Sequence, residues 1–233
     1  MLKARRFLRP GVSLIHGVAL KPADFAEMAK AGVGLVWSPR SNIELYGDTA
    51  NVAAAKAAGV RVALAPDWSP TGSDGLLEEL KYAEVWNQTQ TPPVFNDAEL
   101  ARMATEIPAR MAGLGDRIGE VKAGYAADLL VLRDAGTDRG KDANWTLLHA
   151  GPADVKLVMI GGEAVYGDAA LMEAATGRDD AEGLSVCGAE KRISFASEPA
   201  NESGESWVST TSKLSAAMGE WGRGLAPLAE CSH

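Results

Sequence analysis

The stretch Val60-Arg-Val-Ala-Leu-Ala-Pro-Asp-Trp-Ser-Pro-Thr-Gly-Ser73 decides the fold of this 233-residue chain. Its first half is a short apolar run that predicts a buried strand, and its Pro, Ser, Thr and Gly residues predict a turn. A helical pattern follows, so the stretch is a strand–helix unit with Asp67 at the carboxyl end of the strand. In parallel α/β folds that end faces the active site, which makes Asp67 a candidate site residue. The alternative is an ordinary turn residue, since Asp is common in turns.

Two further strand–helix units precede this one. Residues 11–18 predict a buried strand with His16 near its end, and a second strand at 33–37 leads into a loop at 38–47. Helical patterns separate the three strands, at 22–32 and 49–59. This alternation predicts a parallel sheet, in which the carboxyl ends of the strands share one rim. We therefore expect His16 and Asp67 to converge, and the alternative for His16 is a histidine buried in the core.

The character of the chain changes after Gly115. Residues 128–132 predict a strand, and residues 154–166 predict a hairpin with Gly161 and Gly162 at its turn. Patterns are weaker beyond residue 168, where we expect one strand at 191–196 and a helix at about 206–221. The expected organisation is α/β strand–helix units, a small mainly-β domain and a C-terminal extension with a helix, over residues 1–115, 116–170 and 171–233.

Composition excludes several classes of partner. The formal net charge is −8 and 46% of the residues are apolar, so the chain can build a core and is a poor match for nucleic acid or an acidic membrane surface. No apolar run approaches the roughly 18 residues that span a bilayer. Cys187 and Cys231 have no metal-site spacing and are too few for a disulfide framework, so we expect a reducing, cytoplasmic environment.

Four stretches in order resemble the C-terminal part of an amidohydrolase-superfamily enzyme, of the cytosine-deaminase-like and chlorohydrolase branch. Together they cover roughly residues 12–167, and they run over Ser13–Leu20, Ser38–Asn42, Ala65–Ser73 and Arg117–Leu132. The first three are similar to the ends of the sixth, seventh and eighth strands of the family's barrel, and the fourth to its return into a small β domain. Ala65 and Pro66 replace the more usual Gly-Thr before the aspartate, which we interpret as subfamily variation.

The resemblance implies the last three strand–helix units of a (β/α)8 TIM barrel and a metal-dependent hydrolase. A divalent metal, Zn or Fe, would activate water for attack on a small-molecule substrate, with hydrolysis of a non-peptide C–N bond or, in some relatives, a carbon–halogen bond. By the same resemblance, Asp67 is a metal ligand and general base, and His16 ligates the metal or polarises the substrate. Three residues on the rim loops are expected to contact substrate: Asn42, Trp68 and Ser69.

One departure from the family pattern changes the expectation for the chain by itself. The family's His-x-His pair is absent, because the histidines are His16, His149 and His233. One imidazole and one carboxylate fall short of the three protein ligands of a catalytic zinc site, so this chain alone is expected to be an inactive C-terminal fragment, with a metal only in the complete enzyme. The first strand would expose an unpaired edge, which favours oligomers or a missing N-terminal half. The alternative is a non-catalytic remnant or interaction subunit.

Overall fold

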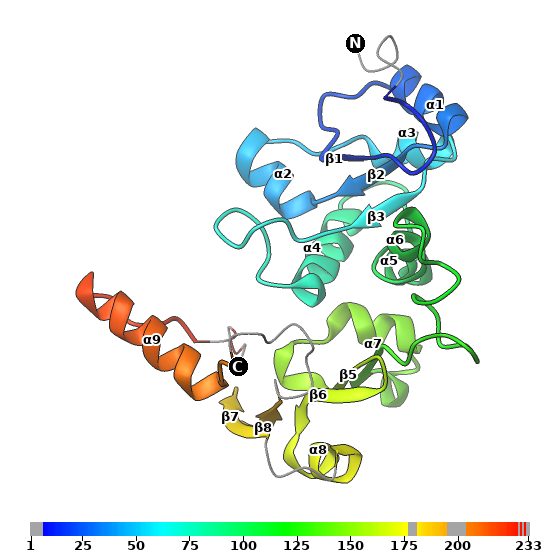
Figure 1. The fold of residues 1–233 in the computed structure, drawn as a ribbon. Coiled ribbons are helices and arrows are strands. Elements are labelled where there is room, and N and C mark those ends of the chain that lie inside the picture. Colours follow the sequence, from blue (N-terminus) through cyan, green and yellow to red (C-terminus); the bar gives the residue numbers. More distant parts are fainter. Residues whose placement is uncertain (1–6, 177–180, 195–203, 228, 230, 232–233) are drawn as a thin grey trace. The chain divides into compact units, whose positions relative to one another are not determined.

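The computed structural model describes residues 7–176, 181–194, 204–227, 229 and 231. The chain forms two compact units, each with its own sheet (Figure 1). The first comprises Met1–Tyr125 and Asp134–His149, and the second comprises Ala126–Arg133 and Ala150–His233. Within the described ranges, no helix combines the length and the apolar character needed to cross a membrane.

The first unit is built on a parallel three-stranded sheet, as the alternating pattern predicts. Its strands follow in the order β1-β2-β3, and they comprise Ser13–Ile15, Gly34–Trp37 and Val62–Leu64. Ser13 pairs with Gly34, and Val36 pairs with Ala63. β1 therefore has β2 as its one neighbour in this sheet, and Ile15 at its end is 62% exposed.

Helices connect and cover these strands. They are α1 (Pro22–Ala31), α2 (Pro39–Tyr46), α3 (Val52–Ala57), α4 (Leu76–Gln88), α5 (Asp97–Met103), α6 (Glu106–Met111) and α7 (Ala143–His149), with a 3-10 turn, η1, at Thr137–Arg139. The expected boundaries of α1 are confirmed: Pro22 stands in its first turn, and Gly32 ends it in the left-handed conformation. The capping box at the start of α5 is also present, with the Asn96 side chain accepting a hydrogen bond from the backbone N–H of Glu99.

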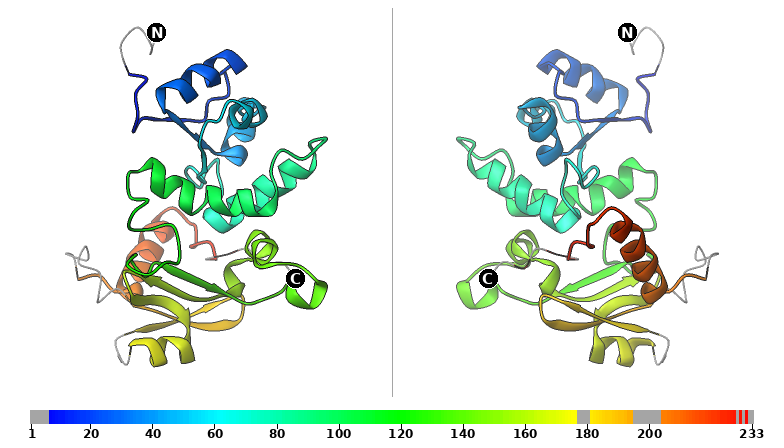
Figure 2. Two further views of the ribbon diagram at one scale, coloured as in Figure 1. Left: turned by 90° about the vertical axis from the view of Figure 1, so that its right-hand side faces the viewer. Right: turned by 90° about the vertical axis from the view of Figure 1, so that its left-hand side faces the viewer.

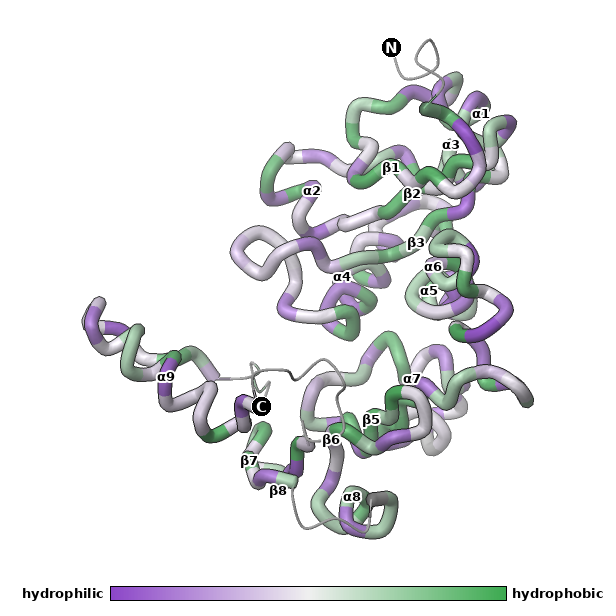
Figure 3. The backbone as a smooth tube through the Cα atoms, in the orientation of Figure 1, coloured by the Kyte–Doolittle hydropathy of each residue, from purple (hydrophilic) through white to green (hydrophobic). Residues whose placement is uncertain are grey.

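Apolar side chains from strands and helices form one core in this unit. Trp37 is fully buried at the end of β2, and its ring contacts Trp86 and Phe95 at centroid distances of 5.0 and 6.0 Å. Other fully buried members include Phe25, Leu35, Ala55, Leu100 and Leu148. The hydropathy colouring follows this arrangement, with mostly hydrophobic residues along the three strands (Figure 3). The core thus holds β2 and its last residue, Trp37, in place. The candidate site lies just beyond the carboxyl ends of these strands.

The segment 38–47, expected as a loop, is helical, and a second short helix precedes residue 150. Residues 38–47 form α2, because Pro39 occupies its first position and Gly47 ends it with φ 69°. His149 lies at the end of α7, which packs against α4 and α5. Both helices gain stability from tertiary packing, which a short and mostly polar sequence pattern does not reveal.

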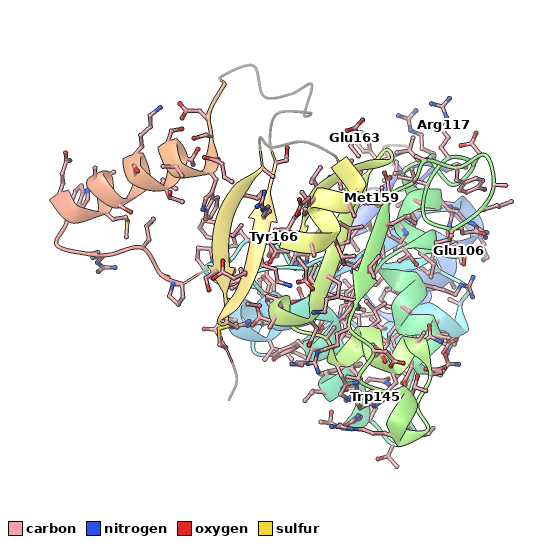
Figure 4. The ribbon with its side chains drawn as sticks, turned by 90° about the horizontal axis from the view of Figure 1, so that it is seen from below. Glu106, Arg117, Trp145, Met159, Glu163 and Tyr166 are labelled. Atoms are coloured by element: carbon pink, nitrogen blue, oxygen red, sulfur yellow. A yellow bond between two sulfur atoms is a disulfide. The ribbon has the colours of Figure 1, made fainter. Side chains whose placement is uncertain are left out.

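The second unit is an antiparallel five-stranded sheet in the order β4-β5-β6-β8-β7, whose strands lie side by side in both views of Figure 2. Its elements are β4 (Leu129–Leu132), η2 (Pro152–Asp154), β5 (Val155–Ile160), β6 (Glu163–Asp168), α8 (Ala169–Thr176), β7 (Glu182–Val186), β8 (Ala189–Ile193) and α9 (Trp207–Glu220). The predicted hairpin and C-terminal helix are confirmed. Figure 4 labels Met159 on β5 and Glu163 and Tyr166 on β6, the two strands of the hairpin. The expected strand at 191–196 corresponds to β8, and residues 195–196 lie outside the described residues.

The two cysteines differ from the sequence expectation. Cys187, in the turn between β7 and β8, forms a disulfide with Cys231 in the C-terminal tail. The spacing of the two cysteines does not predict this pairing, because the partners are brought together across 44 residues of chain. Disulfides are rare in reducing compartments, so this pairing does not support the expected cytoplasmic environment.

Candidate functional site

His16 and Asp67 lie at the same rim of the parallel sheet. His16 follows β1 directly, and its backbone N–H donates to the carbonyl of Val36 on β2. Asp67 follows β3 after Ala65 and Pro66. The structure brings the two side chains together: Nε2 of His16 is 3.8 Å from Oδ2 of Asp67. Both side chains retain more than a quarter of their surface, so a small ligand can reach them.

The backbone is strained at both residues. His16 has φ 67° and Asp67 has φ 64°, in the left-handed region that residues with a Cβ disfavour by roughly 1–2 kcal/mol. Within the described part of the chain, the only other non-glycine residue with positive φ is Cys187. Strained backbone clusters at functional sites, where the surrounding structure holds it in place. Two strained residues that face each other at one rim are therefore a signature of a site.

Asn42, on α2, orients the imidazole of His16. Its Oδ1 is 2.8 Å from Nδ1 of His16, and its Nδ2 donates to Oγ1 of Thr49 at 3.2 Å. Asn42 is fully buried in the structure, where its side chain contacts His16 and Thr49. Contact of Asn42 with a substrate stays a prediction. The ring of Tyr46, also on α2, lies edge-on to the imidazole with centroids 6.0 Å apart.

Ser41, the neighbour of Asn42, orients the carboxylate. Its Oγ donates to Oδ2 of Asp67 at 2.5 Å, and the serine is fully buried. One turn of α2 thus holds both site residues, with consecutive side chains directed to the histidine and to the aspartate. Sequence reasoning missed Ser41, although it stands inside the Ser38–Asn42 motif, because a serine in an expected loop has no distinguishing pattern.

A buried carboxyl group connects α2 to the rim loop after Asp67. Glu79 on α4 is fully buried; it accepts hydrogen bonds from Oγ of Ser73 at 2.5 Å and from the backbone N–H of Arg40 at 3.2 Å. Burial raises the pKa of Glu79, against the opposing effect of these two hydrogen bonds. Ser73 follows Asp67 in the chain and Arg40 lies in the first turn of α2, so Glu79 contacts both segments that carry the site. No sequence pattern singled it out.

Trp68 and Ser69 lie on the rim loop after Asp67. The Trp68 side chain is 63% exposed, and Ser69 is exposed as well. The loop folds back on itself, because the carbonyl of Trp68 accepts hydrogen bonds from the backbone N–H groups of Thr71 and Gly72. Contact of these two residues with a substrate stays a prediction.

His149 has a different environment from His16. His149 stacks on Trp145, labelled in Figure 4, with ring centroids 3.9 Å apart, and its Nε2 is 3.9 Å from Oε1 of Glu84. This environment gives His149 a packing role within α7. His233 lies outside the described residues.

The two donor atoms at the rim are of the chemical types that bind a divalent metal. Nε2 of His16 and Oδ2 of Asp67 are an imidazole nitrogen and a carboxylate oxygen, the pair that Zn and Fe accept. Among the described residues, no group of three His, Cys, Asp or Glu side chains is arranged to hold a metal ion. The site thus supplies two of the three or more protein donors that a catalytic zinc usually has.

Comparisons with known proteins agree on one family. The model of the amidohydrolase family matches residues 3–165. The 5-methylthioadenosine/S-adenosylhomocysteine deaminase of Desulforudis audaxviator is 34% identical over 165 residues, which are 68% of this chain and 38% of the relative. An adenosine deaminase from Xanthomonas campestris, solved with bound zinc, is similar with a TM-score of 0.61 and 26% identity over 69% of this chain and 38% of that one.

A second solved structure has another activity. The atrazine chlorohydrolase of Arthrobacter aurescens TC1, complexed with zinc, is 26% identical with a TM-score of 0.61, over 70% of this chain and 38% of that chain. In each of these comparisons the chain spans 38% of the length of the protein that it matches.

Proposed function

The chain belongs to the amidohydrolase family, and from that premise we propose that His16 and Asp67 are metal-ligating and catalytic residues of a hydrolase that acts on non-peptide C–N bonds. The observation that carries the proposal is the 3.8 Å separation of Nε2 of His16 and Oδ2 of Asp67 at the carboxyl edge of a parallel sheet. The relatives are named as deaminases of adenosine-type nucleosides, so the proposed substrate class is an aminopurine nucleoside or a similar amino-substituted heterocycle.

The roles of the two residues follow from their contacts. Ser41 and His16 both face Oδ2 of Asp67, which leaves Oδ1 to take a proton from the attacking water and to pass it to the departing amine. His16 presents Nε2 to the same space, where it ligates the metal or polarises the substrate. A bound divalent metal would supply the Lewis acid that makes the water acidic near neutral pH. The products are the hydroxyl-substituted ring, as its keto tautomer, and ammonia.

We also propose that the chain corresponds to the C-terminal part of a (β/α)8 barrel and does not turn over substrate alone. The sequence lacks a His-x-His pair, and β1 has one neighbour in its sheet, with Ile15 largely exposed. The missing donors would come from another segment or chain that pairs with this edge. In this proposal residues 1–115 belong to the barrel, 116–170 to the small β domain and 171–233 to an extension.

Zinc binding tests the assignment of the two residues. The purified chain, His16→Ala and Asp67→Ala are titrated with zinc by calorimetry, with His149→Ala as the matched control. We expect the unaltered chain to bind zinc weakly, with a Kd above that of a complete site. His16→Ala and Asp67→Ala should abolish this binding, and His149→Ala should retain it. Binding that is unchanged in both site variants would refute the assignment.

Turnover tests the second part of the proposal. Ammonia release from 5-methylthioadenosine, S-adenosylhomocysteine and adenosine is measured with the chain alone and with added zinc. We expect no release above the rate without enzyme. Zinc-dependent release by the pure chain would show that the site is complete, and the proposal of inactivity would then be wrong.

A further inference from the structure

A chain of hydrogen bonds runs from the core to the imidazole of His16. Nε1 of Trp37 donates to Oγ1 of Thr49 at 2.7 Å, Nδ2 of Asn42 donates to the same oxygen at 3.2 Å, and Oδ1 of Asn42 meets Nδ1 of His16 at 2.8 Å. We propose that Trp37, Thr49 and Asn42 are positioning residues that hold neutral His16 as the tautomer with hydrogen on Nδ1. The tautomer itself does not depend on the proposed function; only the role of Nε2 as a metal ligand or hydrogen-bond acceptor rests on it.

The orientation of the Asn42 amide sets the direction of the chain. An indole N–H can only donate, so Trp37 occupies one lone pair of the Thr49 oxygen. The Asn42 amide nitrogen occupies the other, which turns the amide oxygen toward His16. An amide oxygen can only accept, so Nδ1 of His16 must carry the hydrogen.

Burial and packing keep the chain in one arrangement. Trp37 and Asn42 are fully buried, and the indole contacts the rings of Trp86 and Phe95. Thr49 is held by a hydrogen bond from its own backbone N–H to Oδ1 of Asp48 at 2.7 Å. A buried amide that lost its partners would be left without water to replace them, so rotation of Asn42 is disfavoured.

The tautomer decides what His16 can do. With hydrogen on Nδ1, Nε2 has a free lone pair that points into the space shared with Oδ2 of Asp67, 3.8 Å away. That nitrogen can then ligate a metal or accept a hydrogen bond. The other tautomer would present an N–H donor to the carboxylate, and His16 could no longer ligate through Nε2.

The test measures the tautomer directly and needs neither metal nor substrate. The full chain is labelled with 15N-histidine, and its spectra are recorded about two pH units above the ordinary histidine pKa of about 6.5. His16 is assigned by the signal that disappears in His16→Gln. We expect a protonated Nδ1 and an unprotonated Nε2. A protonated Nε2 in the unaltered protein would overturn the proposal.

Variants test whether the chain of hydrogen bonds is the cause. Thr49→Val removes the shared acceptor at nearly constant size, Asn42→Leu removes the partner of His16, and Thr49→Ser keeps the hydroxyl. We expect Thr49→Val and Asn42→Leu to shift the population toward hydrogen on Nε2, and Thr49→Ser to match the unaltered protein. An unchanged tautomer in Thr49→Val would contradict the proposal. The Thr49→Val and Thr49→Ser pair carries the test if Asn42→Leu does not fold.

Zinc affinity gives an independent second measurement. Loss of a hydrogen bond behind a ligating histidine typically weakens metal binding by roughly 10–100-fold. We expect a loss in that range for Thr49→Val and recovery in Thr49→Ser. If the unaltered protein binds no zinc, the proposed function fails while the spectra still decide the tautomer.

Discussion

Asp67 and His16 face each other across the rim, with Oδ2 to Nε2 at 3.8 Å, and each stands in a left-handed backbone conformation within three residues of the end of a strand. The backbone turns at these two positions so that both side chains enter the same space above the sheet. The protein accepts this strain at two residues where glycine would be more stable, which is expected where the side chain itself is needed.

Replacement of Asp67 by glycine should give a more stable protein than replacement by alanine. Asp67→Gly and Asp67→Ala both lose the hydrogen bond from Ser41, but only alanine keeps the strained Cβ. We expect Asp67→Gly to be more stable than Asp67→Ala by about 1 kcal/mol in urea unfolding, and neither to bind zinc.

The control for this comparison is Ala53→Gly, at an exposed position in α3. There the left-handed argument does not apply, and glycine should cost about 0.5–1 kcal/mol relative to alanine. Equal stability of the glycine and alanine variants at position 67 would show that the backbone there is not strained.

Removal of the Ser41 hydroxyl should loosen the carboxylate of Asp67. Ser41→Ala leaves the fully buried position without its hydrogen bond to Oδ2, and we expect a loss of about 1 kcal/mol in unfolding free energy together with roughly tenfold weaker zinc binding. Ser69→Ala, on the exposed rim loop, should leave stability within about 0.5 kcal/mol of the unaltered protein. If both variants bind zinc equally well, Ser41 does not orient the carboxylate.

Glu79 should make the protein less stable as pH rises. Burial raises its pKa in the folded state, so its favourable contribution is fully present below the unfolded value of about 4.5 and is lost as pH rises through the folded pKa. Glu79→Gln does not titrate; its Oε1 can still accept the hydrogen bond from the backbone N–H of Arg40, and its Nε2 can donate to Oγ of Ser73. We expect the stability of Glu79→Gln relative to the unaltered protein to improve with rising pH, starting at about pH 4.5.

The measurement is urea unfolding at a series of pH values, with Glu44→Gln, on the exposed side of α2, as the control. Each pH unit by which the pKa is raised corresponds to about 1.4 kcal/mol. Parallel curves for Glu79→Gln and the unaltered protein would mean that Glu79 titrates alike in the folded and unfolded states.

In the second unit, Asp168 should be essential because it neutralises a buried lysine. The side chain of Lys191 has no exposed surface; its Nζ donates to the carbonyl of Val155 at 2.6 Å and to Oδ1 of Asp168. Asp168→Ala leaves that ammonium group without its charge partner, so we expect a loss of about 3 kcal/mol or more in thermal or urea unfolding.

Lys156 offers the matched control, because it contacts the other oxygen of Asp168 at 2.8 Å but is 34% exposed. Lys156→Ala breaks an exposed pair and should cost about 1 kcal/mol or less. Similar losses for Asp168→Ala and Lys156→Ala would show that burial of Lys191 does not set the energy of this cluster.

Local sequence determined the elements and the rim. Pro22 and Gly32 bound α1, Asn96 starts α5, and Gly161 with Gly162 turns the hairpin, because each of these residues has dihedral or capping preferences that act within a few positions. The alternation of strands and helices also placed His16 and Asp67 at one edge, since parallel strands end on the same side.

The tertiary structure alone decided which side chains serve the site and how. The structure shows Asn42 as a buried partner of His16, and it shows Ser41 and Glu79 hydrogen-bonded to residues of the rim, contacts that no local pattern predicts. The pairing of Cys187 with Cys231 likewise appeared only in the fold. The physical reason is that burial and hydrogen bonding depend on contacts between residues far apart in the chain, whereas turns, caps and periodicity depend on neighbours.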